Sequence, residues 1–417
     1  MAQFVVEGGT RLTGTIFVHG SKNATLPILA ATLLVEEPIV LKNCPRLRDV
    51  ENMIRILVEL GCIARWEGST LYVDSSGAFG YTLSERLSKE LRSSIFLLGS
   101  VLGRFKKAVA TYPGGCEIGN RPIDLHLMGL RRLGAEIDED GGYICCTGEK
   151  LLGAQVSLDY PSVGATENIM LLACMAEGET VIHNAAREPE IVDLQDFLCA
   201  CGFRVSGAGS SEIVILGGTR GHGCSFTIMP DRIVAGTYLT AAAITGGEIA
   251  LIGAMPEHMV SMLEKLQDAG AYIRKDGARI ILKAPKRPSE LLRLETQPYP
   301  GFPTDMQPQF FALCSVASGI SVIVENVFEN RFRHAQELIK MGGKNSVRGT
   351  MAIVRGVQRL HGAQVTAHDL RGGAALVLAA LSAEGTTVIS CAERIDRGYL
   401  QLEEALCSIG AKVTRKD

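Results

Sequence analysis

An internal repeat constrains the fold of this chain more than any other feature of its sequence. The end of a helix, a glycine and the start of a strand recur six times, as in LVELGCIA, LRRLGAEI and LCSIGAKV. The six glycines lie 68 to 73 residues apart, at Gly61, Gly134, Gly202, Gly270, Gly342 and Gly410. Spacing this regular predicts six copies of one structural unit, each longer than the repeats of common solenoids.

Every copy predicts the same order of elements. It opens with a nearly all-apolar helix, such as GATENIMLLACMA, and continues into a β-branched strand, such as TVIHNAA. An amphipathic helix follows, the glycine ends it, and alternating strands close the copy. Helices that are apolar all round belong inside a domain, and strands with one polar face belong outside. The predicted fold class is therefore an inside-out α/β barrel, with two domains of three repeated helix-and-strand units each.

The length of the chain and its ends predict where the domains divide. A chain of 417 residues is roughly two to three times a typical single core. The last copy begins near Arg371 and is short of strand residues, whereas residues 1–20 are strand-like and precede the first copy. We therefore expect residues 1–20 to complete the sixth copy. One domain would span 21–229 and the other 1–20 plus 230–417, joined by two crossings that suit a hinged cleft.

Charged and polar residues open the six apolar helices. These residues are Lys22 with Asn23, Arg92, Ser162, Asp231 with Arg232, Asp305 and Arg371. The loops before the amphipathic helices add Arg46, Arg48, Arg121, Arg187, Glu188, Arg331 and Arg397. Any one of these arginines could be a solvated surface residue. A set that recurs beside helix N-termini instead favours a strongly anionic ligand, bound without a Walker loop or a GxGxxG turn.

The glycine-rich segment YPGGCEIGNRPIDLHLMG carries the sharpest local signal. Cys116 lies in it between two prolines, and Arg121 follows five residues later. A nearby guanidinium favours the thiolate and lowers the pKa of a thiol. Such a cysteine can donate a proton or add to a substrate carbon. The alternative is a loop cysteine without a role, and His126 in the same segment is expected to pack or cap rather than touch a ligand.

Composition excludes several classes of protein. The net charge of -3 argues against a nucleic-acid binder, and no apolar run approaches the roughly 18 residues that span a bilayer. The N-terminus lacks a signal peptide, which predicts a cytoplasmic protein. The 12 cysteines form no CxxC pair, so no zinc site is expected. Most are expected to be small buried hydrophobes, and the neighbours Cys145 and Cys146, or Cys199 and Cys201, are not expected to be redox pairs.

At these residues the sequence resembles the UDP-N-acetylglucosamine 1-carboxyvinyltransferases of the enolpyruvyl transferase superfamily. The shared motifs cover almost the whole chain: GSKNA at 20–24, PGGCEIGNRPIDLH at 113–126, PSVGATENIM at 161–170, NAAREPEIVDL at 184–194, PDRI at 230–233, FPTDMQPQF at 302–310, FENRF at 328–332, HDLRGGAALVLA at 368–379 and IDRGY at 395–399. The resemblance implies the same two-domain fold, with the Cys116 loop as a moving lid.

The resemblance also implies an activity. The enolpyruvyl group of phosphoenolpyruvate would move to the 3-hydroxyl of UDP-N-acetylglucosamine with release of phosphate, the first committed step of peptidoglycan precursor synthesis. The partners would be these two small molecules alone, with no cofactor, metal, nucleic acid or membrane. An anionic epoxide such as fosfomycin is expected to alkylate Cys116.

The roles of individual residues follow from the resemblance. Cys116 would be the proton donor, and Asp305 would lie near the sugar 3-hydroxyl. Phosphoenolpyruvate would be bound by Lys22, Asn23, Arg121 and Arg397. The UDP-sugar would be bound by Arg92, Arg121, Pro122, Ile123, Asp124, Leu125, Ser162, Val163, Gly164, Asp305 and Val327. Asp369 and Arg371 of the DLR motif would support the site, and Arg331 is expected among the substrate-binding residues.

The sequence departs from the family at two points, and two other functions stay open. Tyr160 stands where some relatives carry a lysine, and RGGAAL at 371–376 differs from RASASL; both affect ligand packing. One alternative is the sister enzyme that uses shikimate 3-phosphate, although the Cys116 loop and the NAAREPE segment favour the UDP-sugar. The other is a UDP-sugar-binding protein without turnover.

Overall fold

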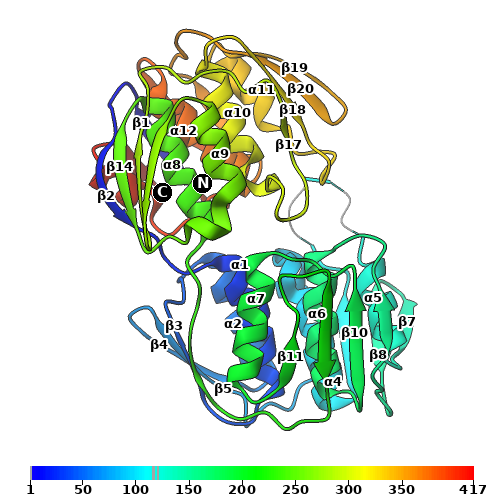
Figure 1. Cartoon of the computed structure of the whole chain (residues 1–417). Helices are drawn as coiled ribbons and strands as arrows, with labels where there is room; N and C mark the ends of the chain where they lie inside the picture. The colour runs from blue at the N-terminus through cyan, green and yellow to red at the C-terminus, as the bar shows by residue number, and fades with distance from the viewer. Residues whose placement is uncertain (1, 115–117, 120–121) are drawn as a thin grey trace. The chain divides into compact units, whose positions relative to one another are not determined.

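The structure is a computed structural model that describes residues 2–114, 118–119 and 122–417. These residues form two compact units. Unit 1 contains the N-terminal segment up to His19, residues 118–119 and residues 230–417. Unit 2 contains residues 20–114 and 122–229. The chain passes from one unit to the other after His19 and again after Met229 (Figure 1).

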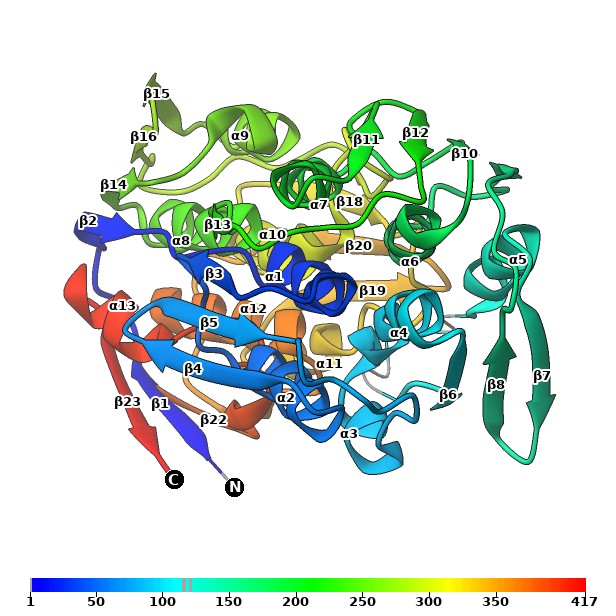
Figure 2. The same ribbon diagram turned by 90° about the horizontal axis from the view of Figure 1, so that it is seen from below.

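Unit 2 is built around three helices whose residues are almost all buried. The inner helices are α1 (Lys22–Ala31), α4 (Leu97–Phe105) and α6 (Val163–Met175). The amphipathic helices are α2 (Arg48–Glu59), α5 (Asp124–Arg132) and α7 (Pro189–Ala200). Short helical segments are η1 (Thr32–Leu34), α3 (Glu85–Glu90) and η2 (Arg92–Phe96). Figure 2 shows α1, α4 and α6 surrounded by the strands of this unit.

Three sheets cover unit 2. The first has the order β13-β3-β5-β4, the second β6-β8-β7 and the third β11-β12-β10-β9. Their strands are β3 (Ile39–Lys42), β4 (Ile63–Glu67), β5 (Thr70–Asp74), β6 (Lys107–Thr111), β7 (Glu136–Asp140), β8 (Tyr143–Thr147), β9 (Gln155–Ser157), β10 (Glu179–His183), β11 (Arg204–Ser206), β12 (Glu212–Leu216) and β13 (Ser225–Thr227). In the second sheet, a parallel bridge from Thr82 to Val109 takes the place of a fourth strand.

Unit 1 repeats the same plan. Its inner helices are α8 (Arg232–Thr245), α10 (Gln307–Val316) and α12 (Leu370–Ser382), which pack against one another. Its outer helices are α9 (Val260–Asp268), α11 (His334–Lys340) and α13 (Leu402–Ser408). Short helices are η3 (Pro256–Met259), η4 (Thr304–Met306) and η5 (Ala392–Arg394). The inner helices are apolar on all sides, and only a central position buries every side of a helix.

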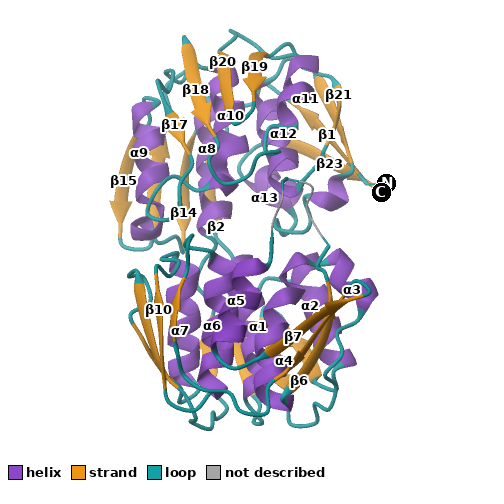
Figure 3. Cartoon of the chain, turned by 90° about the vertical axis from the view of Figure 1, so that its right-hand side faces the viewer, coloured by secondary structure: helices purple, strands orange, loops and turns teal. Residues whose placement is uncertain are grey.

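The three sheets of unit 1 lie outside these helices (Figure 3). Their orders are β15-β16-β14-β2, β17-β18-β20-β19 and β21-β22-β1-β23. Their strands are β1 (Gln3–Glu7), β2 (Thr13–Phe17), β14 (Glu248–Ile252), β15 (Tyr272–Asp276), β16 (Arg279–Lys283), β17 (Leu294–Glu295), β18 (Ile320–Val324), β19 (Lys344–Arg348), β20 (Met351–Arg355), β21 (Gln364–Thr366), β22 (Thr386–Ser390) and β23 (Lys412–Lys416). The inside-out α/β fold predicted from the repeat is confirmed in both units.

The first residues of the chain divide between two sheets. Strand β1 pairs antiparallel with β22 and β23 and so completes the sixth copy, as predicted. Strand β2 instead pairs parallel with β14 and completes the fourth copy, so the prediction for residues 1–20 is wrong for this strand. The reason is that the sheets beside the two crossings exchange their parallel edge strands, because β2 precedes α1 of unit 2 and yet pairs with β14 of unit 1. In unit 2, β13 completes the first sheet by pairing parallel with β3.

The six repeat glycines end the six outer helices in the same way. Each has a positive φ between 87° and 99° and lies two residues after the last helical residue. At the first of them, the Gly61 amide donates to the Val58 carbonyl and the next amide, of Cys62, donates to Leu57. The other five repeat this pair of bonds. This Schellman arrangement requires a left-handed residue, which explains why glycine recurs there.

No helix in the described part of the chain is long and apolar enough to cross a membrane.

Candidate functional site

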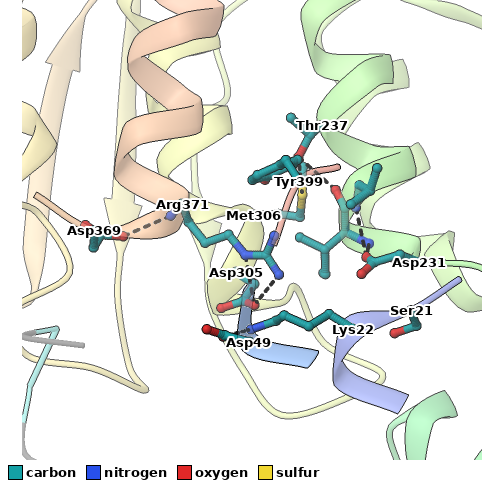
Figure 4. Close-up of polar contacts among 12 residues, drawn as sticks. Ser21, Lys22, Asp49, Asp231, Thr237, Asp305, Met306, Asp369, Arg371 and Tyr399 are labelled. Carbon is teal, nitrogen blue, oxygen red and sulfur yellow. Dashed lines mark hydrogen bonds and ion pairs between the residues drawn. The ribbon is translucent and has the colours of Figure 1, made fainter. Parts of the chain in front are cut away.

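A carboxylate held by two buried arginines is the most strongly organised polar cluster of unit 1. Arg331 donates from Nη2 to Oδ1 of Asp305 at 2.8 Å. Arg371 donates from Nε and Nη2 to Oδ2 at 3.1 and 3.0 Å (Figure 4). Both arginine side chains are only 2% exposed, whereas that of Asp305 is 28% exposed. The carboxylate therefore lies at the edge of the cluster, where a ligand could reach it.

Three separate elements bring this cluster together. Asp305 lies in η4 just before inner helix α10, Arg331 precedes α11, and Arg371 is the second residue of α12. Asp369 caps α12, because its Oδ1 accepts from the amides of Arg371 and Gly372 at 3.0 and 2.9 Å. This cap fixes the first turn of α12 and with it the direction of the Arg371 side chain.

Burial and charge act in opposite directions on Arg371. Burial lowers the pKa of its guanidinium, but Asp305, Tyr399 and Asp231 together raise it by more, so the pKa lies above its ordinary value. The guanidinium also lies 5.3 Å from the ring centroid of Tyr399, a cation–π distance. The Tyr399 hydroxyl is 2.9 Å from Oγ1 of Thr237 (Figure 4). It also accepts from Gln309 at 3.1 Å. Arg371 is thus held permanently charged and in one place.

A buried glutamate, which sequence analysis missed, links η4 to the loop before Arg331. Glu325 is fully buried and directly follows β18. Its Oε1 accepts from the amides of Val327 and Phe328 at 2.9 and 3.1 Å, and its Oε2 accepts from the Thr304 hydroxyl at 3.0 Å. The Glu325 carboxylate therefore fixes both Thr304, which precedes Asp305, and the backbone at Val327. The only sequence signal was a charged residue at the end of the apolar run ISVIV.

In unit 2, the opening of α1 carries a second charged pair. Lys22 Nζ lies 3.2 Å from Oδ2 of Asp49, with the side chains 12% and 3% exposed (Figure 4). Ser21 caps the helix by accepting from the Ala24 amide at 3.3 Å. Asn23 is the second residue of α1 and is half-buried. A nearly buried ammonium beside a helix N-terminus is suited to binding an anion.

The start of α6 forms a second part of the candidate site in unit 2. Ser162 caps α6 by accepting from the Ala165 amide at 3.3 Å. Val163 and Gly164 follow it and are half-buried. A side chain at Gly164 would lie about 3.0 Å from both His126 and Phe96, so glycine allows the close packing of α6 against α5 and η2.

His126 is buried and lies 3.2 Å from the Asn168 amide nitrogen, which also donates to the Ile95 carbonyl at 3.0 Å. It therefore packs in the protein, as expected. Arg92 opens η2 and is half-buried, with Nη1 3.5 Å from the Pro113 carbonyl.

The glycine-rich segment is described in part. Cys116 and Arg121 lie outside the described residues. Ile118 and Gly119 belong to unit 1, where the Ile118 carbonyl accepts from the Asn330 amide at 3.0 Å. Gly119 has a φ of 148°, and a Cβ there would lie 2.5 Å from the Glu329 carboxylate. The positive φ favours glycine at Gly119, and any other residue there would also push the Glu329 side chain aside.

The structure places the other predicted residues in two groups. Within unit 2, Pro122 and Asp124 are exposed, Leu125 is half-buried, and Ile123 is buried at the N-cap of α5. Within unit 1, Val327 and Arg397 are half-buried and Asp369 is buried. Arg331, which the sequence analysis expected among the substrate-binding residues, donates to Asp305.

Comparisons with known proteins agree on the family. A model of the EPSP synthase (3-phosphoshikimate 1-carboxyvinyltransferase) family matches residues 6–406. UDP-N-acetylglucosamine 1-carboxyvinyltransferase 2 of Caldanaerobacter subterraneus subsp. tengcongensis is 51% identical over 415 residues, which cover 100% of both chains. UDP-N-acetylglucosamine 1-carboxyvinyltransferase 1 of Symbiobacterium thermophilum is 49% identical and covers 99% of this chain and 95% of its own.

Solved structures add the fold. The enolpyruvyl transferase NikO from Streptomyces tendae is 24% identical, with a TM-score of 0.90 over 99% of this chain and 98% of its own. EPSP synthase from Acinetobacter baumannii is 19% identical, with a TM-score of 0.76 over 100% of both chains. At these identities the similarity concerns the fold alone. The full-length identity to the relatives above is more specific, and by it the chain belongs to the EPSP synthase family of enolpyruvyl transferases and, within that family, to the UDP-N-acetylglucosamine 1-carboxyvinyltransferases.

Proposed function

We propose that this protein transfers the enolpyruvyl group of phosphoenolpyruvate to the 3-hydroxyl of UDP-N-acetylglucosamine and releases phosphate. The observation that carries this proposal is the 51% identity, over the full length, to an enzyme named for the same transfer. The product would be the first committed precursor of peptidoglycan, made in the cytoplasm. Phosphoenolpyruvate and UDP-N-acetylglucosamine would be the only partners that the reaction requires.

The charges of the two substrates match the predicted residues. Phosphoenolpyruvate carries a phosphate and a carboxylate, for which we propose Lys22, Asn23, Arg121 and Arg397 as ligands. The UDP-sugar carries a diphosphate, for which we propose Arg92, Arg121 and the residues at the start of α5 and α6. Cations placed in advance are often the largest contribution to catalysis, on the order of 3 kcal/mol for each critical contact. Arg92 and Arg397 are only half-buried, so a ligand could reach them.

The first chemical step would be an addition. The 3-hydroxyl oxygen of the sugar forms a bond to C2 of phosphoenolpyruvate, the C2–C3 double bond takes a proton at C3, and the hydroxyl loses its own proton. We propose the Cys116 thiol as the donor of the proton at C3. General acid and base groups of this kind contribute roughly 100- to 10,000-fold to the rate.

Asp305 is the group proposed to receive the hydroxyl proton. Arg331 and Arg371 hold both of its carboxylate oxygens in place. The value of Asp305 lies in holding the hydroxyl in place and accepting the proton once the new C–O bond has made that proton strongly acidic. A carboxylate fixed by Arg331 and Arg371 suits this positioning role.

The second step would be an elimination. The C2–O bond to phosphate breaks, C3 loses a proton, and the double bond forms again on the transferred group. No electrons are gained or lost overall, so the reaction needs no redox partner. The phosphate ester supplies the leaving group, and the residues proposed for phosphate binding stabilise its charge as it departs.

Identification of the product tests the proposal. The protein is incubated with phosphoenolpyruvate and UDP-N-acetylglucosamine, and the nucleotide sugar is examined by mass spectrometry and proton NMR. We expect one enolpyruvyl group, with its vinyl protons, attached at the sugar 3-hydroxyl. Unchanged nucleotide sugar with tight binding would instead identify a UDP-sugar-binding protein without turnover, and attachment at another hydroxyl would contradict the proposed acceptor.

A further inference from the structure

Two thiols of unit 2 lie in contact with each other, and neither belongs to a residue proposed for the transfer reaction. The Sγ atoms of Cys201 and Cys224 are 3.4 Å apart. Cys201 caps the C-terminus of α7, and Cys224 immediately precedes β13. Cys201 is buried, whereas Cys224 is partly exposed. One sulfur of the pair is therefore accessible from solvent, and the other is next to it in the interior.

The backbone fixes this contact at both cysteines. The His222 amide donates to the Cys201 carbonyl at 2.9 Å, and the Val40 amide donates to the Cys224 carbonyl at 2.9 Å. The His222 ring lies against Gly202, where a Cβ would come within 2.8 Å of it. Since a disulfide bond is about 2.05 Å long, the sulfurs need to approach by only roughly 1.4 Å to form one.

The two thiols differ in acidity in a way that suits oxidation. Contact with the other thiol raises the pKa of Cys201, and burial raises it further. The same contact lowers the pKa of Cys224, with a smaller contribution from His222. The exposed thiol thus ionises first, and thiolates are the form that oxidants attack. Among the described residues, no group of three or more His, Cys, Asp or Glu side chains could hold a metal ion, so the pair is not part of such a group.

We propose that Cys201 and Cys224 form a reversible disulfide, made by reaction with a peroxide and broken by a dithiol reductant. The Cys224 thiolate attacks one oxygen of hydrogen peroxide, which gives a sulfenic acid and, with one proton, water. The Cys201 sulfur then attacks the sulfenic sulfur, the S–S bond forms, and the hydroxyl leaves with the Cys201 proton as a second water. Two thiols are oxidised by two electrons, and one peroxide is reduced to two waters.

The bond would tie the end of α7 to the strand that leads to the second crossing between units. It would close a loop over residues 202–223, which contains β11 and β12. Closing such a loop restricts the unfolded chain and stabilises the folded one. The expected effect is a rise of several degrees in the Tm of unit 2 on oxidation, and dithiothreitol should reverse it.

Peptide mapping of the full chain tests the proposal directly. The reduced protein is treated with hydrogen peroxide at a low molar excess, free thiols are blocked with N-ethylmaleimide, and the unreduced digest is analysed by mass spectrometry. We expect the peptides of Cys201 and Cys224 to appear joined, two hydrogen masses lighter than the sum of the reduced peptides. The proposal would be overturned if Cys201 and Cys224 both carried N-ethylmaleimide in a sample in which other, exposed thiols had been oxidised. So would Cys201 joined mainly to Cys174 or Cys199.

Variants provide a second readout. Cys201→Ser and Cys224→Ser should each abolish the rise in Tm on oxidation. Cys199→Ser is the matched control, because Cys199 is an exposed cysteine two residues away on α7 whose Sγ contacts the Val205 carbonyl instead. The control should keep the full rise in Tm. An equal rise in Cys224→Ser would contradict the proposal, and if either serine variant fails to fold, the mapping of the unsubstituted chain still decides.

Discussion

The guanidinium of Arg371 holds one carboxylate oxygen of Asp305 through two nitrogens, at 3.1 and 3.0 Å. Arg331 holds the other oxygen at 2.8 Å, so neither side of the carboxylate can rotate without breaking a charged hydrogen bond. Two residues that are far apart in the sequence thereby fix the group that we propose to orient the sugar hydroxyl.

Arg371→Lys should lower kcat on the order of 100-fold and change the KM for phosphoenolpyruvate much less. Lysine keeps the positive charge but loses the two-nitrogen contact, so Asp305 is left free to shift, and a misplacement of about 1 Å costs a comparable factor. Steady-state phosphate release measures both constants. An unchanged kcat would show that the position of Asp305 does not matter to the reaction.

Arg415→Lys is the matched control for this substitution. Arg415 also binds a carboxylate through two nitrogens, with Nη1 and Nη2 2.7 and 2.8 Å from the oxygens of Asp396. This pair is about a quarter to a third exposed and none of its members is proposed to bind substrate. The kcat of Arg415→Lys should stay within about twofold of that of the unsubstituted protein. Exposed ion pairs contribute only about 1 kcal/mol or less to stability, so weakening this pair should leave the protein folded.

Glu325→Gln should destabilise unit 1 by about 1 to 3 kcal/mol and raise the KM for UDP-N-acetylglucosamine. The amide loses the charge that strengthens the hydrogen bonds from Val327, Phe328 and Thr304, and it places a donor where only acceptors are needed. Thermal unfolding and phosphate release measure the two effects. Glu295→Gln is the control, because this carboxylate on the neighbouring strand β17 is more exposed than that of Glu325. It should change the stability and the KM only slightly. Equal effects in the two variants would refute the role given to Glu325.

Stability should depend on pH through Asp193. The pKa of this carboxyl is raised to about 7, chiefly by burial. A hydrogen bond from the Met229 amide at 3.3 Å opposes the rise, and the charges of Asp196 and Glu190 add to it. Between about pH 4 and pH 7 the folded protein therefore binds more protons at this site than the unfolded chain. Its contribution to stability is present below about pH 4 and is lost as the pH rises through about 7.

Asp193→Asn removes this titration and keeps an acceptor for the Met229 amide. The variant should nearly match the unsubstituted protein at pH 4 and be more stable at pH 8 by on the order of 2 kcal/mol, a value reduced for the partial exposure of the side chain. Urea unfolding at the two pH values measures it. Asp138→Asn, at an exposed position on β7 of the same unit, is the control. A pH-independent difference for Asp193→Asn would argue against a raised pKa.

Cys116→Ala should lower turnover by roughly 100- to 10,000-fold, because it removes the proposed proton donor, whereas Cys116→Asp should keep substantial activity. Fosfomycin should alkylate Cys116 before any other thiol, as peptide mapping can determine. Cys199→Ala controls for the loss of an exposed thiol elsewhere and should leave turnover unchanged. Near-normal phosphate release by Cys116→Ala would remove this residue from the mechanism.

The fold could be predicted from the sequence because its signals are local. Wholly apolar helices must be buried, and a glycine at the end of each outer helix is required by a left-handed backbone. Strand pairing is not a local property, and for this reason the prediction placed β2 in the wrong sheet. Nothing in TGTIF distinguishes a partner at β14 from one at β22; the choice depends on the arrangement of the whole sheet.

The candidate site was predictable by residue type but not by geometry. Asp305 and Arg371 stand at equivalent places in the repeat, so each could be proposed separately. Their mutual binding, and the part of Arg331 in it, depends on how three copies converge. Glu325 was missed because a carboxylate that binds backbone amides has no sequence pattern of its own. The contact between Cys201 and Cys224 likewise follows from tertiary structure, since the two cysteines share no motif spacing.

The most direct test of the proposed function compares two acceptors on one preparation of the protein. Phosphate release is measured with saturating phosphoenolpyruvate and varied UDP-N-acetylglucosamine, and then with varied shikimate 3-phosphate. We predict a kcat/KM for the nucleotide sugar that exceeds the other by at least about 10,000-fold, as expected of a site built around the polar groups of one substrate. An equal or higher kcat/KM with shikimate 3-phosphate would contradict the assignment.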